Sequence, residues 1–194
     1  MTRLALLLFT LGVLCLPPAV WARDRAEPAP ATRGALTYTL SPGAASWPEA
    51  KRTQIVKAMD EALALYNRYA PFEKALRVSY VPSVPTADGN YNGHIRFGGT
   101  INTRIALHEI SHTLGVGTTG AWQKGLRKGQ WTGAGSVALV QGFDGPDTIL
   151  RGDRQHFWPY GLNYDREDGV VQRVRHVLLV ERLCRDMALP VFRR

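Results

Sequence analysis

The chain of 194 residues has only two cysteines, Cys15 and Cys184, and this scarcity limits what can stabilise its fold. Cys15 lies in an apolar N-terminal run that we expect to be removed, so a single thiol would remain and no intramolecular disulfide could form. Cys184 lies among apolar residues in a helical pattern, and we interpret it as a buried, inert thiol. Stability must therefore come from packing, supplemented by metal if one binds.

The sequence also lacks an apolar run of the roughly 20 residues that a membrane-spanning helix needs. The apolar run Leu4–Leu16 is shorter; Arg3 precedes it and small residues follow it up to Ala22, which is the pattern of a cleaved signal peptide. We therefore expect an exported protein, secreted or periplasmic, with no stable membrane anchor after cleavage. This interpretation divides the chain into a signal peptide (1–22), a flexible Ala- and Pro-rich leader (23–33) and one domain (34–194).

Acidic residues are few: 16 Asp and Glu oppose 24 Lys and Arg, for a formal net charge of +8. An excess of this size favours anionic partners such as nucleic acid, glycans or membrane surfaces. Net charge alone says little about function, so we interpret the chain as a basic exported protein and do not expect nucleic acid as its partner. Internal repeats are not visible, which argues against a repeat architecture.

Hydrophobic periodicity predicts strands and helices in alternation. The first helix should begin behind a capping box at Ser46–Glu49 and end near Tyr69, before Pro71. The final helix should turn five residues inward, namely Val170, Val171, Val174, Val177 and Leu178. The predicted elements are strands at 35–40, 76–81 and 93–98, a short helix at 105–115, a short strand at 136–141 and a final helix at 168–189.

The short helix carries the motif His108–Glu109–Ile110–Ser111–His112. Residues four apart lie on one face of a helix, so His108 and His112 can present two imidazoles to one metal ion. Glu109 can reach a water molecule beside that metal, which is the arrangement of zinc hydrolases. Local signals agree with this helix. Asn102 is a predicted N-cap, and Gly115 is a predicted left-handed stop. The apolar stripe consists of Leu107, Ile110 and Leu114.

With Gly115, the motif reads H-E-x-x-H-x-x-G and resembles the first part of the metzincin signature among the zincin metallopeptidases. The order of predicted elements is similar as well. The resemblance implies an α+β, zincin-like fold, with a small twisted sheet, a backing helix and the active-site helix in an upper part (34–115). An irregular lower part (116–194) would end in a C-terminal helix. The resemblance also implies a Zn²⁺ cofactor.

The metzincin pattern places a third ligand three residues after the glycine, where this chain has Thr118, a poor zinc ligand. We choose His156 instead, because it lies in an unusually aromatic stretch (152–164) that should pack beneath something. This stretch would replace the metzincin Met-turn, because Met187 lies too far along the chain to form that turn. It is also similar to a stretch that accompanies the H-E-x-x-H-x-x-G motif in exported bacterial proteins. The alternative ligands are His94, His176, Glu167 and Glu181.

In the mechanism that this site implies, Glu109 takes a proton from water and returns it to the leaving amine. A second donor is needed beside the metal, and Tyr160 and Tyr164 are candidates because they follow His156 closely, although packing roles explain them equally well. Gly98 and Gly99 are candidates for binding an extended substrate on the preceding strand; the alternative is a tight turn.

The sequence thus predicts an exported zinc metallopeptidase that acts on protein or peptide. The alternative is a non-catalytic module, on the same scaffold, that binds an anionic glycan or nucleic acid. A glycine-rich basic loop at 117–135, with Trp122 and Trp131, fits either hypothesis, and we favour a role in packing or at a cleft rim.

Overall fold

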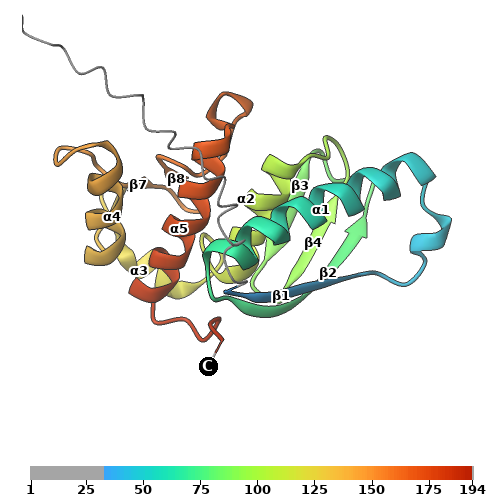
Figure 1. Ribbon diagram of the computed structural model, residues 1–194, viewed down its shortest axis with the longest axis horizontal. Coiled ribbons are helices and arrows are strands. Elements are labelled where there is room, and N and C mark those ends of the chain that lie inside the picture. The colour runs from blue at the N-terminus through green and yellow to red at the C-terminus, as the bar shows by residue number, and fades with distance from the viewer. Residues whose placement is uncertain (1–32, 194) are drawn as a thin grey trace, which may run out of the picture.

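The computed structural model describes residues 33–193, so the predicted signal peptide and nearly all of the predicted leader lie outside the described residues. Within this range the chain forms a mixed α+β fold with helices α1–α5 and two four-stranded sheets (Figure 1). No helix in this range combines the length and the apolar character that a membrane-spanning helix requires.

The first sheet has three parallel strands and one antiparallel strand at its edge. Its order is β1-β2-β4-β3, so β1 and β3 are its two edge strands and β4 has a neighbour on each side. Side chains alternate between a buried and an open face, as expected for a sheet covered on one side. The strands are β1 (Ala35–Leu40), β2 (Glu73–Tyr80), β3 (Ala87–Asn90) and β4 (His94–Phe97).

Helices α1 (Glu49–Tyr69) and α2 (Thr103–Leu114) pack against each other and against this sheet (Figure 1). The extent of α1 agrees with the prediction, but the capping box is wrong. Pro48 is the N-cap and forms no side-chain cap. Ser46 instead belongs to a preceding 3₁₀ turn (Ala44–Ser46), where its hydroxyl donates to the Gly43 carbonyl at 2.7 Å.

The second sheet is antiparallel, with the order β5-β6-β7-β8, and it packs with three helices in the lower part of the chain. Trp122 and Trp131 are both buried and stack with ring centroids 4.8 Å apart, which confirms a packing role for these two side chains. The loop predicted at 117–135 is wrong, because this segment contains a short helix and two short strands. The elements are α3 (Gly120–Gly125), β5 (Leu126–Arg127), β6 (Gln130–Trp131), α4 (Ala134–Asp144), β7 (Arg151–Gly152), β8 (Phe157–Trp158), a 3₁₀ turn (Asp165–Glu167) and α5 (Val170–Asp186).

The strand predicted at 136–141 is wrong, since these residues lie within α4. Ser136 and Val140, four residues apart, are its buried positions, which is a helical spacing. The Ser136 hydroxyl also binds the Asp186 carboxylate on α5, so packing between two distant segments selects the helix.

The inward face predicted for α5 is wrong in the first turn of the helix, while Val174 and Leu178 further along are half-buried. Val170 is 83% exposed and Val171 is 55% exposed, because the first turn of α5 stands clear of α4 and α2 at the top of Figure 1. Val177 is buried as predicted. Cys184 is also buried, as predicted, and this burial raises the pKa of its thiol.

Candidate metal centre

The predicted motif helix is confirmed at both ends. The Asn102 side chain accepts a hydrogen bond from the Ile105 amide at 2.9 Å, and Gly115 ends α2 with φ 116°. The apolar stripe is fully buried against the core, at Leu107, Ile110 and Leu114. These contacts fix the rotation of α2, so its opposite side faces the lower part of the molecule.

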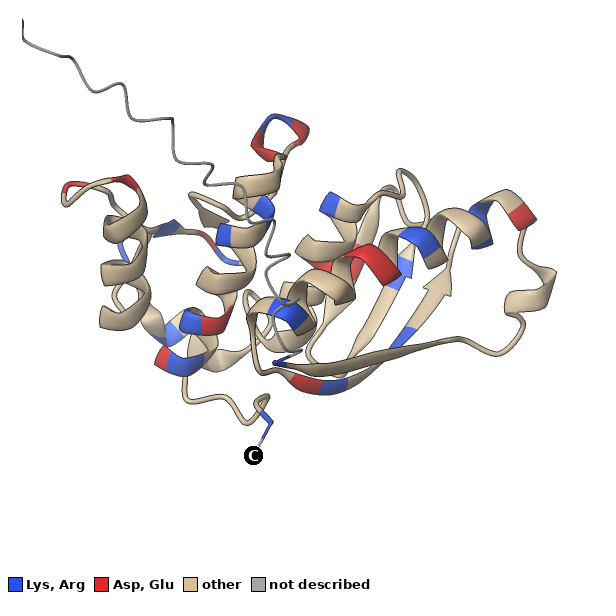
Figure 2. Ribbon diagram, viewed as in Figure 1, with Lys and Arg blue, Asp and Glu red and all other residues tan. Residues whose placement is uncertain are grey.

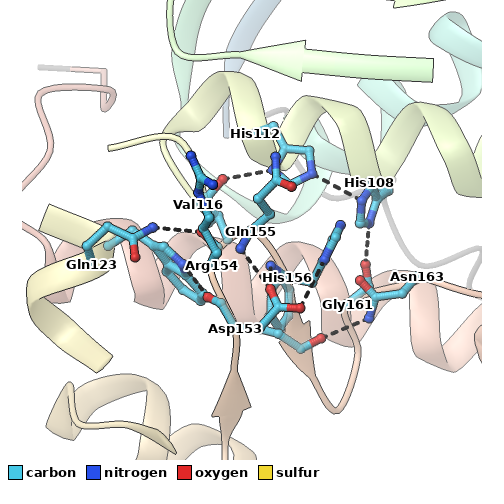
Figure 3. Close-up of polar contacts among 12 residues, drawn as sticks. His108, His112, Val116, Gln123, Asp153, Arg154, Gln155, His156, Gly161 and Asn163 are labelled. Carbon is cyan, nitrogen blue, oxygen red and sulfur yellow. Dashed lines mark hydrogen bonds and ion pairs between the residues drawn. The ribbon is translucent and has the colours of Figure 1, made fainter. Parts of the chain in front are cut away.

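Two histidines of this helix are oriented by main-chain carbonyls (Figure 3). His108 Nδ1 lies 2.8 Å from the Gly161 carbonyl, and His112 Nδ1 lies 2.8 Å from the Val116 carbonyl. A carbonyl oxygen can only accept, so each Nδ1 must carry the proton, and each neutral ring then keeps a lone pair on Nε2. Partners of this kind orient metal-ligating histidines in general.

His156 completes a cluster with the two helical histidines (Figure 3). One ligand atom from each of the three rings lies within 4.8 Å of the others. His156 Nδ1 lies 3.4 Å from an Asp153 carboxylate oxygen, and its ring stacks on that of His108 with centroids 5.5 Å apart. The structure therefore brings together all three residues that we predicted as metal ligands.

The donor set fits a metal ion. His108 Nε2 and His112 Nε2 lie 3.1 Å apart, and two lone pairs at this distance repel unless they share a cation. Nitrogen ligands of a tetrahedral zinc ion, at about 2.0–2.1 Å from the metal, lie about 3.3 Å from each other. Burial also lowers the pKa of both imidazoles, so both are neutral near pH 7, as metal ligation requires. The cluster can therefore hold a metal ion.

Glu109 lies beside the cluster and is 6% exposed. Burial, followed by the negative charge of Asp88, raises the pKa of its carboxyl to about 8, while Arg104 opposes this shift. A cation held by the three histidines would also favour the ionised carboxylate. This environment suits a group that takes up and releases a proton near neutral pH.

The histidines and Glu109 face a cleft of about 290 Å³ between the two parts of the molecule. Its upper wall is the edge strand β3, and its lower wall comes from residues 155–163. Gly89 allows β3 to approach α2 closely, since a Cβ atom there would lie 2.4 Å from the Glu109 carbonyl oxygen. An extended strand edge therefore borders the candidate metal centre.

The two tyrosines predicted as donors do not line this cleft. The Tyr160 hydroxyl donates to the Asp144 carboxylate at 2.7 Å and accepts from Arg175, on the side of α4 and α5. Tyr164 is 49% exposed and lies under the Arg166 guanidinium. The structure thus does not bring either hydroxyl to the three histidines.

The two glycines predicted to bind substrate also lie outside the cleft. The amides of Gly98 and Gly99 both donate to the Thr86 carbonyl, at 2.9 and 3.0 Å. Their missing side chains make room for the carbonyls of Val84 and Pro85. Because β4 is paired on both sides, the strand beside the cleft is β3, which lies between the strands predicted at 76–81 and 93–98 and was not itself predicted.

The remaining histidines have separate roles. His94 lies on the open face of the first sheet, where Nε2 is 2.8 Å from the Ser79 hydroxyl. His176 is fully buried beneath the aromatic stretch and stacks on Phe157 with centroids 5.8 Å apart. Its Nδ1 donates to the Tyr160 carbonyl at 2.7 Å. Both histidines are thus engaged away from the metal cluster.

Sequence reasoning missed several polar residues of the cleft, among them Arg104, Gln155 and Asn163. Arg104 lies one helical turn before His108, and that spacing is a signal that could have found it. Its guanidinium donates to the Leu162 carbonyl at 2.6 Å and thereby ties α2 to the aromatic stretch. Gln155, next to His156, and Asn163 also line the cleft, and Figure 3 shows the Gln155 side chain reaching towards His112.

Comparisons with protein-family models, with curated proteins and with solved structures give no match. We therefore infer the function from the geometry of the cleft.

Proposed function

We propose that this chain is an exported zinc-dependent metallopeptidase on a zincin-like scaffold. The observation that carries the proposal is the convergence of three histidine nitrogens within 4.8 Å of one another, beside a buried carboxyl group. A purely structural metal site has no need of an adjacent base, so Glu109 favours catalysis over a binding module.

His108, His112 and His156 would hold the ion. When bound, zinc supplies Lewis acidity, which polarises a scissile carbonyl and lowers the pKa of water. Glu109 accepts the proton of the attacking water and returns it to the leaving amine. The Gln155 amide faces the same cleft and supplies the hydrogen-bond donor that the developing oxyanion needs. The proposal thus moves this role from Tyr160 and Tyr164 to Gln155.

A polypeptide substrate fits this cleft because β3 is an edge strand. The unpaired amides and carbonyls of such a strand can pair with an extended peptide. β3 contributes Ala87, Asp88 and Gly89 to the wall opposite His156. Substrate alignment is therefore assigned to β3 in place of Gly98 and Gly99.

The proposal is tested first by metal content. Purified protein should carry about one zinc ion per chain, measured by inductively coupled plasma mass spectrometry. His156→Ala should lose most of it. His94→Ala is the matched control, since it removes a histidine outside the cleft, and it should keep its zinc. Zinc retained in His156→Ala would refute the three-histidine site.

Catalysis is tested next with Glu109→Gln, which preserves the volume of the buried side chain. We expect zinc to remain bound while the cleavage of unfolded casein falls by about 10²–10⁴-fold, the usual contribution of a positioned base. Full activity in this variant would overturn the mechanism. Bound zinc without any hydrolysis by the unsubstituted protein would favour the binding module instead.

A further inference from the structure

The second sheet carries a row of polar and aromatic side chains on one face. In register, Arg127 lies opposite Gln130, Gln130 opposite Arg151, and Arg151 opposite Trp158. Residues directly opposite each other in a sheet project from the same face. We name this set the arginine row: Arg127, Gln130, Arg151 and Trp158.

The arginine row faces outward. The alternate positions of the same strands are turned inward, and three of them are buried, at Trp131, Gly152 and Phe157. Within the row, the two arginines and the glutamine are exposed and the tryptophan is half-buried. Figure 2 shows basic segments around β7, on this side of the molecule.

Both arginines keep a positive charge with which an external anion can pair. Arg127 Nη1 donates to the main-chain carbonyls of Lys124 and Leu126, at 2.6 and 2.9 Å, and the other donors of its guanidinium are left for such an anion. Among residues 33–193, no carboxylate lies within 4.0 Å of the Arg127 or Arg151 guanidinium. Arg151 shares a groove with two acidic residues. Of these, Asp144 is bound by Arg175, and Glu167 accepts from the Asn163 amide at 2.8 Å. The row is therefore a cationic surface whose neighbouring acids are already engaged.

The arginine row leads to the candidate metal centre. His156 and Trp158 are two residues apart and project to the same side, while Phe157 between them is buried. The rings of His156 and Trp158 lie with centroids 6.1 Å apart. A chain that lies across the outer face of the second sheet therefore reaches His156 at its end.

We propose that the arginine row binds an acidic segment of the polypeptide substrate, on one side of the scissile bond. This inference rests on the proposed peptidase function. Arg127 and Arg151 are two strands apart, or about 10 Å. A peptide in the polyproline-II conformation covers about 9 Å in three residues, and side chains three positions apart then lie on the same face. Each guanidinium can pair with one carboxylate. The expected substrate thus has two acidic residues about three positions apart.

A nucleic acid fits this surface less well. A typical duplex-binding protein makes about 6–10 phosphate contacts, and single-strand binders stack successive bases on several aromatic rings. The arginine row offers two guanidinium groups and one tryptophan. Its size and spacing therefore favour a short acidic peptide.

The test is fluorescence anisotropy with a labelled decapeptide that carries two glutamates three positions apart, and with its glutamine counterpart. The glutamate peptide should bind about tenfold more tightly, and Arg127→Gln/Arg151→Gln should remove this preference. Arg52→Gln/Arg68→Gln, which removes the same charge from α1, should change affinity less than about twofold. Equal losses in both double variants would overturn the proposal, because net charge alone would then explain binding.

Two further outcomes separate this surface from the catalytic proposal, because anisotropy needs no turnover. Row-dependent binding without hydrolysis would support the surface while refuting the peptidase. Hydrolysis with no preference for glutamate would refute the surface while leaving the peptidase intact. A heparin fragment or oligonucleotide that binds the row more tightly than the glutamate peptide would also overturn it.

Discussion

Acid should destabilise the metal-free protein through His176. This side chain projects from α5 and is fully buried against α1 and the aromatic stretch. Its Nε2 lies 3.0 Å from the Tyr66 hydroxyl and 3.1 Å from the Leu107 carbonyl. Burial lowers the pKa of its imidazole from 6.5 to about 4. The unfolded chain therefore takes up a proton on this residue before the folded chain does.

The sign and size of the effect follow from this difference. The contribution of His176 to stability is fully present above the unfolded pKa of 6.5, and it is lost as pH falls towards about 4. Between about pH 7.5 and about pH 4.5 the free energy of unfolding should fall by about 2.5 kcal/mol from this residue alone. Because Nδ1 already donates to the Tyr160 carbonyl, the added proton goes to the buried Nε2.

The assay is urea unfolding, followed by tryptophan fluorescence, at both pH values in the presence of a chelator. His176→Gln and His176→Met cannot titrate, so both should lose about 2.5 kcal/mol less than the unsubstituted chain over this pH range. Their difference from that chain isolates His176 from the other buried titratable groups. If both variants keep the original pH dependence, the inference that His176 is neutral in the folded chain is refuted.

Three other substitutions test the cleft. Asp153→Asn should weaken zinc binding by about 10–100-fold in a competition with a chromogenic chelator, since it removes the charged partner of His156; unchanged affinity would count against this contact. Gln155→Ala should lower kcat for peptide hydrolysis by about 10²-fold with little change in KM, whereas a change in KM alone would assign it to substrate binding. Gly89→Ala should lower the free energy of unfolding by about 1–3 kcal/mol, measured by thermal unfolding, because its Cβ would meet the Glu109 carbonyl oxygen. An unchanged stability would mean that β3 can move away from α2.

The motif helix was predictable because its signals are local. The N-cap, the apolar stripe and the terminal glycine all lie within one short segment, from Asn102 to Gly115. His156 was predictable for a different reason: zinc chemistry demands a third ligand, and few histidines remain. Its place in the cluster agrees with that argument, while the identity of the metal stays a prediction.

The features that escaped prediction depend on distant contacts. β3 contains Asp88, Gly89 and Asn90, which are typical turn residues, and pairing with β4 makes them a strand. The first two valines of α5 look apolar enough to be buried, yet their environment is set by where the other helices end. Local propensity does not depend on such distant neighbours, so the edge strand that borders the cleft could not be predicted from the sequence.

The groups that orient the histidines are also invisible in a sequence, for a physical reason. His108, His112 and His176 are each held by a main-chain carbonyl, from Gly161, Val116 and Tyr160 respectively. A carbonyl is the same group in every residue, so side-chain identity does not reveal it. What matters is the backbone path: Tyr160 and Leu162 adopt positive φ values of 66° and 56°. The aromatic side chains of this stretch hold that path in place, and the path orients the imidazoles.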